Sequence, residues 1–196
     1  MRTDNLYSLP ENLPLPEDDG ACNHLRRSML PSIGLKATSG PMVDLSKEGR
    51  PWLVVYCYPR TGRPDQEPPG GVAAWNAIPG ARGCTPQSCA YRDHYTELTA
   101  LGAALYGLST QDTEYQSEAV QRLHLPFPLL SDSEKKLVQA YHVWVEKSMY
   151  GKKYFGSERT TFIIGPDQRI AGILKKVKPS EHIKALRQVL FVGEAV

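Results

Sequence analysis

Short runs of apolar, β-prone residues recur along the chain and predict the strands of a sheet. The run at 52–58, Trp-Leu-Val-Val-Tyr-Cys-Tyr, is nearly all apolar, which is typical of a strand buried on both faces. A second buried strand is predicted at 104–109, and a hairpin within 30–44 turns at Ser39-Gly40-Pro41. Further strands are predicted at 126–130, 160–164 and 169–174.

Between these runs, apolar residues recur at the spacing of amphipathic helices. Thr85 is a suitable N-cap and Pro86 suits the first helical position, so a helix is predicted from there until Gly102. Further helices are predicted at 112–123, at 133–141 and from Ser180 onward. Strands and helices alternate first, and an antiparallel hairpin plus a helix comes last. This order predicts an α/β fold with three layers, α/β/α, around a central mixed sheet.

Three segments carry no such pattern. Residues 59–83 form a loop rich in Pro and Gly, longer than the roughly 12–15 residues that compact domains usually tolerate without a function. Residues 143–156 are mixed and hold Gly151 and Gly156, so they are predicted to be a loop. Residues 1–28 are polar and proline-rich and are predicted to be an N-terminal extension. The single domain is then expected over 29–196.

Composition narrows the class of protein. The formal net charge of +2 is too balanced to indicate nucleic acid as a partner. The only basic cluster, Lys175-Lys176-Val177-Lys178, is short and is expected in a solvated turn. No run of about 18 apolar residues predicts a membrane span, and the first residues lack the apolar stretch of a signal peptide. Four cysteines are too few for a disulfide scaffold, so we expect a reducing compartment, the cytoplasm.

Cys84 and Cys89 bracket the start of the predicted helix at 86–101. Cys84 should face free backbone N–H groups and the positive end of the helix dipole, both of which favour the thiolate. If both residues were helical, they would lie about 7.5 Å apart along the axis, with side chains roughly 140° apart. A disulfide needs Cα atoms about 4.4–6.8 Å apart. Either the pair never bonds, or the start of the helix unwinds when it does; two buried packing cysteines are the remaining alternative.

Four stretches of the sequence resemble the peroxiredoxins, specifically the bacterioferritin-comigratory or Q-type group. They are Val55-Tyr56-Cys57-Tyr58-Pro59, Gly83-Cys84-Thr85-Pro86-Gln87-Ser88-Cys89 followed by Arg92-Asp93, Leu125-Pro126-Phe127-Pro128-Leu129-Leu130-Ser131-Asp132, and Arg159-Thr160-Thr161-Phe162-Ile163-Ile164. The resemblance implies a thioredoxin-like fold, with Cys84 as the peroxidatic cysteine, Cys89 as the resolving cysteine and Arg159 as an active-site arginine.

The chain departs from that family in one place. The family pattern is Pro-x-x-x-Thr-x-x-Cys, but Ala77 and Ala81 occupy the proline and threonine positions here. In one interpretation Pro59 and Thr61 are the displaced counterparts, with the long loop inserted between them and Cys84. In the other, Pro79 shields the thiolate, and Thr85 or backbone N–H groups hold the peroxide, with Gly83 as a further candidate for substrate binding. Gln87 either hydrogen-bonds near the site or faces solvent.

The leading hypothesis is a thiol peroxidase. A hydroperoxide would oxidise Cys84 to a sulfenic acid, Cys89 would condense with it to a disulfide, and thioredoxin or a similar dithiol would reduce the disulfide. We expect no cofactor and no metal, because the five histidines show no ligand spacing beside the cysteines. We expect no nucleic acid or membrane partner, and either a monomer or a homodimer.

Two other functions are weighed against this one. A thioredoxin-type disulfide reductase is disfavoured, because such enzymes use Cys-x-x-Cys and here four residues intervene. A redox sensor or holdase without significant turnover is the alternative from another class. Cys57 is expected in the core, and Cys22 is expected to be incidental, or else an accessible thiol able to pair with another chain. Trp75 is more often an anchor of its own loop than a lid.

Overall fold

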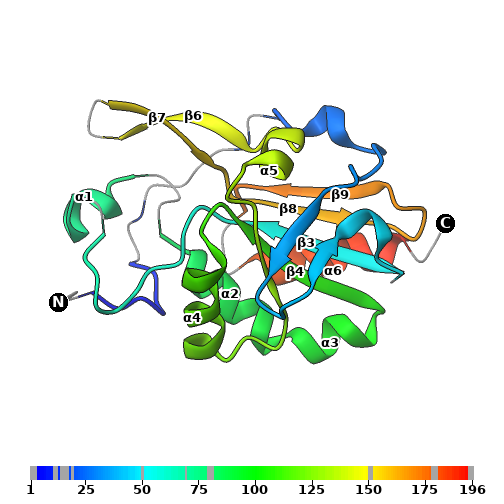
Figure 1. Ribbon diagram of the computed structural model, residues 1–196, viewed down its shortest axis with the longest axis horizontal. Helices are drawn as coiled ribbons and strands as arrows, with labels where there is room; N and C mark the ends of the chain where they lie inside the picture. The colour runs from blue at the N-terminus through cyan, green and yellow to red at the C-terminus, as the bar shows by residue number, and fades with distance from the viewer. Residues whose placement is uncertain are drawn as a thin grey trace.

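A computed structural model of the protein describes residues 4–10, 13, 18, 20–49, 51–68, 70–78, 82–149, 152–177 and 181–193. A seven-stranded sheet in the order β2-β1-β5-β4-β3-β8-β9 forms its centre (Figure 1). The strands are β1 (Gly34–Ala37), β2 (Met42–Asp44), β3 (Trp52–Cys57), β4 (Ala103–Ser109), β5 (Leu129–Ser131), β8 (Thr160–Ile164) and β9 (Ile170–Lys175). β3, β4 and β5 pair in parallel and the other pairs are antiparallel. The predicted mixed sheet is thus confirmed.

Helices cover both faces of this sheet (Figure 1). These helices are α2 (Cys84–Asp93), α3 (Tyr95–Ala100), α4 (Thr113–Leu123), α5 (Lys136–Ala140) and α6 (His182–Gly193), and short 3-10 turns lie at Asn23–Leu25 and Leu45–Lys47. Helix α1 (Val72–Asn76) has no buried residue and lies to one side of the sheet (Figure 1). Buried residues of α2, α3, α4 and α6 form one apolar cluster, and α5 and the segment around Leu25 belong to the other. The three-layer arrangement is therefore as predicted. In the described part of the chain, no helix is both long and apolar enough to cross a bilayer.

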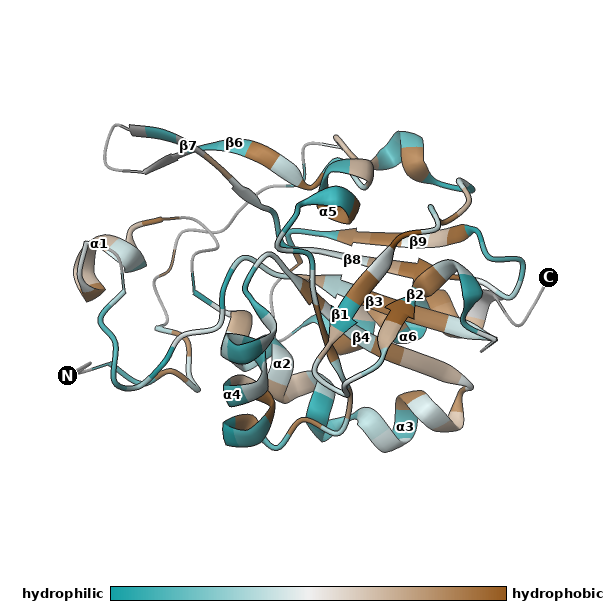
Figure 2. Ribbon diagram, in the orientation of Figure 1, coloured by the Kyte–Doolittle hydropathy of each residue, from teal (hydrophilic) through white to brown (hydrophobic). Residues whose placement is uncertain are grey.

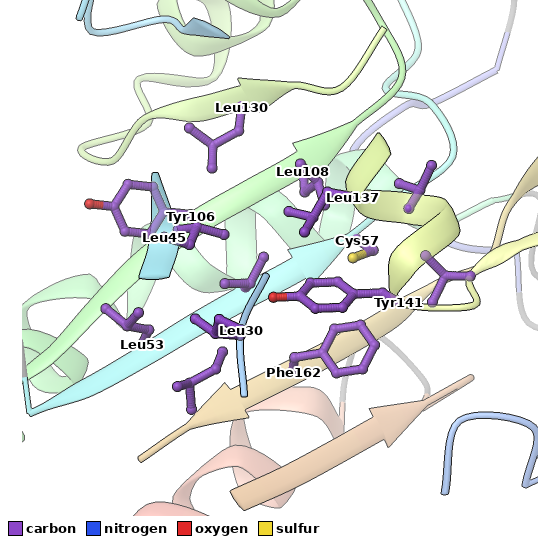
Figure 3. Close-up of a cluster of buried hydrophobic side chains, with 14 of the residues drawn as sticks. Leu30, Leu45, Leu53, Cys57, Tyr106, Leu108, Leu130, Leu137, Tyr141 and Phe162 are labelled. Carbon is purple, nitrogen blue, oxygen red and sulfur yellow. The ribbon is translucent and has the colours of Figure 1, made fainter. Parts of the chain in front are cut away.

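The central strand β3 separates these two clusters. Leu53, Val55 and Cys57 face one of them, while Tyr56 and Tyr58 face the other, and all are fully buried. Figure 3 shows Cys57 beside Tyr141 and Phe162, under α5. Figure 2 shows hydrophobic residues concentrated on the central strands, whereas α4 carries many hydrophilic ones. Burial on both faces explains why the sequence of this strand shows no alternation. Cys57 is confirmed as a core residue.

The prediction of a loop over 143–156 is wrong. β6 (Trp144–Met149) and β7 (Lys152–Ser157) pair as an antiparallel hairpin that extends away from the main sheet (Figure 1). Its pattern is weak because the hairpin is a separate two-stranded sheet, and Phe155 is largely exposed. A strand that buries little gives little periodicity to read.

Other boundaries differ by a few residues. The helix predicted until Gly102 is divided at His94 into α2 and α3. The strand predicted at 126–130 lies at 129–131, and the helix predicted at 133–141 is the shorter α5. Asp132 explains the start of α5, because its carboxylate accepts hydrogen bonds from the backbone N–H groups of Lys136, Leu137 and Val138 at 2.7–2.9 Å.

The structure excludes the alternative interpretation of Cys22, and it contradicts the expectation of a solvated turn at Lys175. Cys22 is only 1 % exposed, and its thiol donates to the carbonyl oxygen of Tyr141 at 3.9 Å, so it is not an accessible spare thiol. Lys175 does not lie in a solvated turn, because it ends strand β9 and is buried. Both Lys175 and Lys176 form ion pairs with Glu158, at 3.0 and 3.2 Å. The split into an extension and a domain stays a prediction, although Leu6, Cys22 and Leu25 of the extension are buried.

Candidate active site

Cys84 is the first residue of α2 and is 3 % exposed. Its position follows from Gly83, which occupies the N-cap with φ of 113°, a left-handed conformation that glycine adopts without a steric penalty. The prediction of Thr85 as N-cap is therefore wrong. Thr85 lies inside the first turn, where it is buried. Cys84 is thus the first residue of the helix rather than the residue before its N-cap, and it still lies at the end where backbone N–H groups are free.

Arg159 lies beside this sulfur, although 75 residues separate it from Cys84 along the chain. Its side chain is buried immediately before β8. One guanidinium nitrogen, Nη2, donates to Cys84 Sγ at 3.4 Å and to the carbonyl oxygen of Arg82 at 3.0 Å. The other, Nη1, donates to Gln87 Oε1 at 2.6 Å. A fixed cation at hydrogen-bond distance favours a thiolate at this position.

Gln87 is fully buried, so of its two interpretations the structure favours the one near the site. Hydrogen bonds toward the central sheet also hold the turn that contains Cys84. Ser88 Oγ donates to the carbonyl oxygen of Cys84 at 3.0 Å and lies 3.1 Å from the hydroxyl of Tyr56 on β3. The buried sheet therefore sets the position of the first turn of α2, and with it the sulfur.

A cavity opens above Cys84, and Thr61 lines it together with Gly83 and Thr85. Thr61 is buried, and Gln111 Oε1 accepts from its backbone N–H at 3.1 Å and from its hydroxyl at 3.4 Å. Thr61 and Thr85 line the same cavity, so both interpretations of the missing family threonine stay predictions. Pro79 lies outside the described residues.

The outer wall of the cavity comes from segments that the sequence does not connect with the site. Leu6, Trp75 and Tyr115 line it, and Tyr115 also donates its hydroxyl proton to the carbonyl oxygen of Thr61 at 2.9 Å. Trp75 belongs to α1, a helix inside the predicted loop, and it borders the cavity; its role as an anchor of that loop stays a prediction. The extension and the loop thus take part in shaping the entrance.

Arg82 joins these outer segments to the site. Its guanidinium donates to Asp4 Oδ2 at 2.6 Å, to Asn76 Oδ1 at 2.9 Å, and to the carbonyl oxygens of Asn5 and Ser8. The N-terminal residues consequently lie beside α1 (Figure 1). Nothing in the sequence marks this contact, because it joins residues more than seventy positions apart.

A buried polar network extends behind Gln87, and sequence reasoning missed it. His182 Nε2 lies 3.3 Å from Gln87 Nε2 and 2.7 Å from Thr161 Oγ1, which is 3.1 Å from the hydroxyl of Tyr91. Burial, and then the charge of Arg159, lower the pKa of His182 to about 4, while a backbone interaction with Val177 opposes this shift. His182 has no other histidine or cysteine at metal-ligand spacing, so the sequence does not mark it as a functional residue.

Cys89 lies on the same unbroken helix as Cys84, is half-buried, and both thiols are free. Burial raises the pKa of the Cys89 thiol, and the cation of Arg92 opposes that shift. With four residues of continuous helix between the two, the helical geometry keeps the sulfurs apart. The structure therefore corresponds to the dithiol form, and a disulfide requires the first turns of α2 to unwind. Among the described residues, no group of three or more His, Cys, Asp and Glu side chains is arranged to hold a metal.

Comparison with known proteins identifies the family to which the chain belongs. The family model described as AhpC/TSA matches residues 70–173. Peroxiredoxin Bcp of Bacillus subtilis is 32 % identical over 160 residues, which cover 82 % of this chain and 90 % of the relative. The chain is a peroxiredoxin. Peroxiredoxin Bcp of Escherichia coli K12 is also 32 % identical, over 78 % of this chain and 86 % of the relative. Members of this family are thiol-dependent peroxidases, a class of oxidoreductase, so the predicted activity is confirmed at this level.

Solved structures support the same assignment. Peroxiredoxin Q from Xanthomonas campestris superposes with a TM-score of 0.67 at 26 % identity, covering 92 % of this chain and 96 % of that one. Another structure from the same organism, described as a bacterioferritin comigratory protein with alkyl peroxide reduction activity, has the same TM-score and identity and 97 % coverage of its chain. The peroxiredoxin therefore has the thioredoxin-like fold that the resemblance implies.

The buried histidine of this peroxiredoxin predicts a pH dependence of its stability. The pKa of His182 is about 4 in the folded protein against an ordinary 6.5, so between these values the unfolded chain binds a proton that the folded protein does not. Stability is then full above pH 6.5 and falls as the pH drops toward 4. We expect the free energy of unfolding, from urea titrations at pH 6.5 and 4.5, to fall more in the wild type than in His182→Gln. Carboxylates titrate in both proteins, so equal losses would contradict the prediction.

Proposed function

We propose that Cys84 is the peroxidatic cysteine of this peroxiredoxin and that Arg159 assists it. The thiolate sulfur attacks the distal oxygen of a hydroperoxide ROOH, and the O–O bond breaks. The sulfur is oxidised to a sulfenic acid, Cys–S–OH, and the departing RO⁻ takes up a proton to leave as ROH. The observation that carries the proposal is the 3.4 Å contact between Arg159 Nη2 and Cys84 Sγ at the start of α2. The guanidinium there stabilises the thiolate first and the negative charge on the departing oxygen afterwards.

The cavity supplies the remaining groups. Thr61, which lines the same cavity as Cys84, is a candidate for orienting the peroxide, and the backbone N–H groups of Gly83 and Thr85 are candidates for binding it. Hydrogen peroxide and organic hydroperoxides both suit this chemistry. Leu6, Trp75 and Tyr115 on the outer wall provide apolar surface for an organic group R.

Cys89 is the proposed resolving cysteine. Its thiol condenses with the sulfenic acid, which forms a Cys84–Cys89 disulfide and releases water. For this step α2 has to lose its first turns, including the bond from the Gln87 N–H to the Gly83 carbonyl oxygen at 2.8 Å. Thioredoxin or a similar dithiol then reduces the disulfide by exchange and is itself oxidised. We place this cycle in the cytoplasm on the basis of the few, free cysteines.

Thiol counting and intact mass test the cycle directly. After one equivalent of hydrogen peroxide, we expect the wild type to lose two of its four thiols without gaining oxygen. In Cys89→Ser the sulfenic acid has no partner, so we expect a gain of about 16 Da, or a dimedone adduct, on Cys84. A Cys22→Ala variant, which changes a thiol in the opposite core cluster, should behave as the wild type does. Four free thiols after treatment of the wild type would refute the assignment of Cys84.

A further inference from the structure

The far end of the site is a histidine contributed by a different part of the chain. His182 opens α6, which packs against β9 and contacts α2, and it is 0 % exposed. Gln87 lies between it and Arg159. Three segments far apart in sequence, the start of α2, the residue before β8 and the start of α6, thus meet behind the Cys84 sulfur.

The donor and acceptor roles in this network follow from Arg159. A guanidinium only donates, so Gln87 presents its oxygen to Arg159 and its NH₂ group to His182. The tautomer that lets the Gln87 NH₂ group donate to His182 is the one with Nε2 unprotonated. The Thr161 hydroxyl, 2.7 Å away, donates to the same nitrogen, which leaves the Tyr91 hydroxyl as the donor to Thr161 Oγ1. The single lone pair of Nε2 is shared between the Thr161 hydroxyl at 2.7 Å and the Gln87 NH₂ group at 3.3 Å, so the bond from Gln87 is the longer of the two.

We propose that His182 is a positioning residue, which holds the Gln87 amide in the orientation that fixes the Arg159 guanidinium against Cys84. Without an acceptor at position 182, the Gln87 NH₂ group loses the partner at 3.3 Å that sets its orientation, and a flip of the amide would turn it toward the guanidinium. Arg159 would then lose its 2.6 Å bond to Gln87 and the constraint on its contact with the sulfur. The inference deepens the proposed function, since it assumes that the Arg159 contact activates Cys84.

The charges around His182 agree with this role. Arg159 is the cation that faces it, and Tyr91 is the titratable group on the α2 side. Burial raises the pKa of Tyr91, so the phenol stays neutral, and His182, with its lowered pKa, is neutral at physiological pH. A protonated His182 would present an N–H to Gln87 and a second positive charge to Arg159. The accepting form is thus the form that the surroundings favour.

Two substitutions at one position separate positioning from packing. His182→Phe keeps a ring but offers no acceptor, whereas His182→Gln restores an acceptor oxygen. We expect His182→Phe to lower the second-order rate of Cys84 oxidation by hydrogen peroxide about tenfold and to raise the Cys84 pKa by about one unit, and His182→Gln to recover most of both. The Cys84 pKa is read from the pH dependence of iodoacetamide alkylation, with the modified residue identified by mass.

Leu186→Ala is the matched control, because Leu186 is a fully buried residue of the same helix outside the network. It should lower the melting temperature and leave the Cys84 pKa unchanged. An unchanged pKa and rate in His182→Phe, or an equal shift in Leu186→Ala, would overturn the proposal. If His182→Phe does not fold, Gln87→Leu removes the same link from the α2 side and must give the same pKa shift. Because alkylation needs no peroxide, the wild type reveals separately whether Cys84 is peroxidatic at all.

Discussion

A Cys84→Ser variant is expected to consume no hydroperoxide above the uncatalysed rate. The catalytic step needs a nucleophile that is largely ionised at neutral pH. A helix N-terminus and a neighbouring cation both favour the thiolate form of a cysteine. A serine hydroxyl at the same place stays protonated and cannot be oxidised to a sulfenic acid. The measurement is NADPH oxidation coupled through thioredoxin reductase and thioredoxin, with hydrogen peroxide and with an organic hydroperoxide.

The Cys84→Ser result is informative only beside a folded control. Cys22→Ala removes a buried thiol from the cluster on the other side of the sheet and should retain turnover. Activity that survives in Cys84→Ser would mean that another cysteine carries the reaction. A wild type that loses its thiols once but does not turn over would instead support the sensor or holdase alternative.

Arg159→Ala should slow the reaction of Cys84 with peroxide by roughly 10²–10³, the usual effect of removing a preorganised charge donor from an active site. The variant loses the guanidinium contact with the sulfur and also the bonds to Gln87 and to the Arg82 carbonyl oxygen. Single-turnover oxidation at low peroxide isolates the step, because reduction of the disulfide then plays no part. An unchanged rate constant would make Arg159 a structural residue only.

Arg159→Lys separates the charge from the geometry. Lysine restores a cation but not the planar fork that reaches Cys84, Arg82 and Gln87 at once. We expect the rate of Arg159→Lys to lie between those of the wild type and Arg159→Ala. Its melting temperature shows how much stability is lost when the buried oxygens of Gln87 and Arg82 have no donor. A lysine variant as slow as the alanine one would assign the effect to bond geometry.

Most strands of the central sheet can be predicted from the sequence. Apolar runs at β3, β4 and β8 are readable because these strands are buried on both faces. The β6–β7 hairpin was missed because it buries too little to impose a period, and the N-terminus of α2 was misplaced because Gly83 caps it through backbone conformation rather than through a side chain.

The site was predictable only where its residues are adjacent in sequence or match a family motif. Cys84, Cys89 and Arg159 fall in such stretches. His182, Thr161 and Tyr91 do not, because their hydrogen bonds join positions whose proximity depends on the packing of α6 and β8 against α2. The Arg82–Asp4 ion pair could not be predicted from the sequence for the same reason. Contacts of this kind follow from the fold and leave no local pattern.

Thr61 and Cys84 border one cavity although a long loop with its own helix α1 lies between them. The loop follows strand β3 and ends where helix α2 begins. A change in the length of the loop therefore does not change how the strands pair. Doubling such a loop costs only about 0.6 kcal/mol in closure entropy. A search for the contiguous family motif would discard this chain. The same interruption means that residues around Trp75 can change in number and kind, and with them one wall of the cavity, while the Cys84 sulfur stays in place on α2.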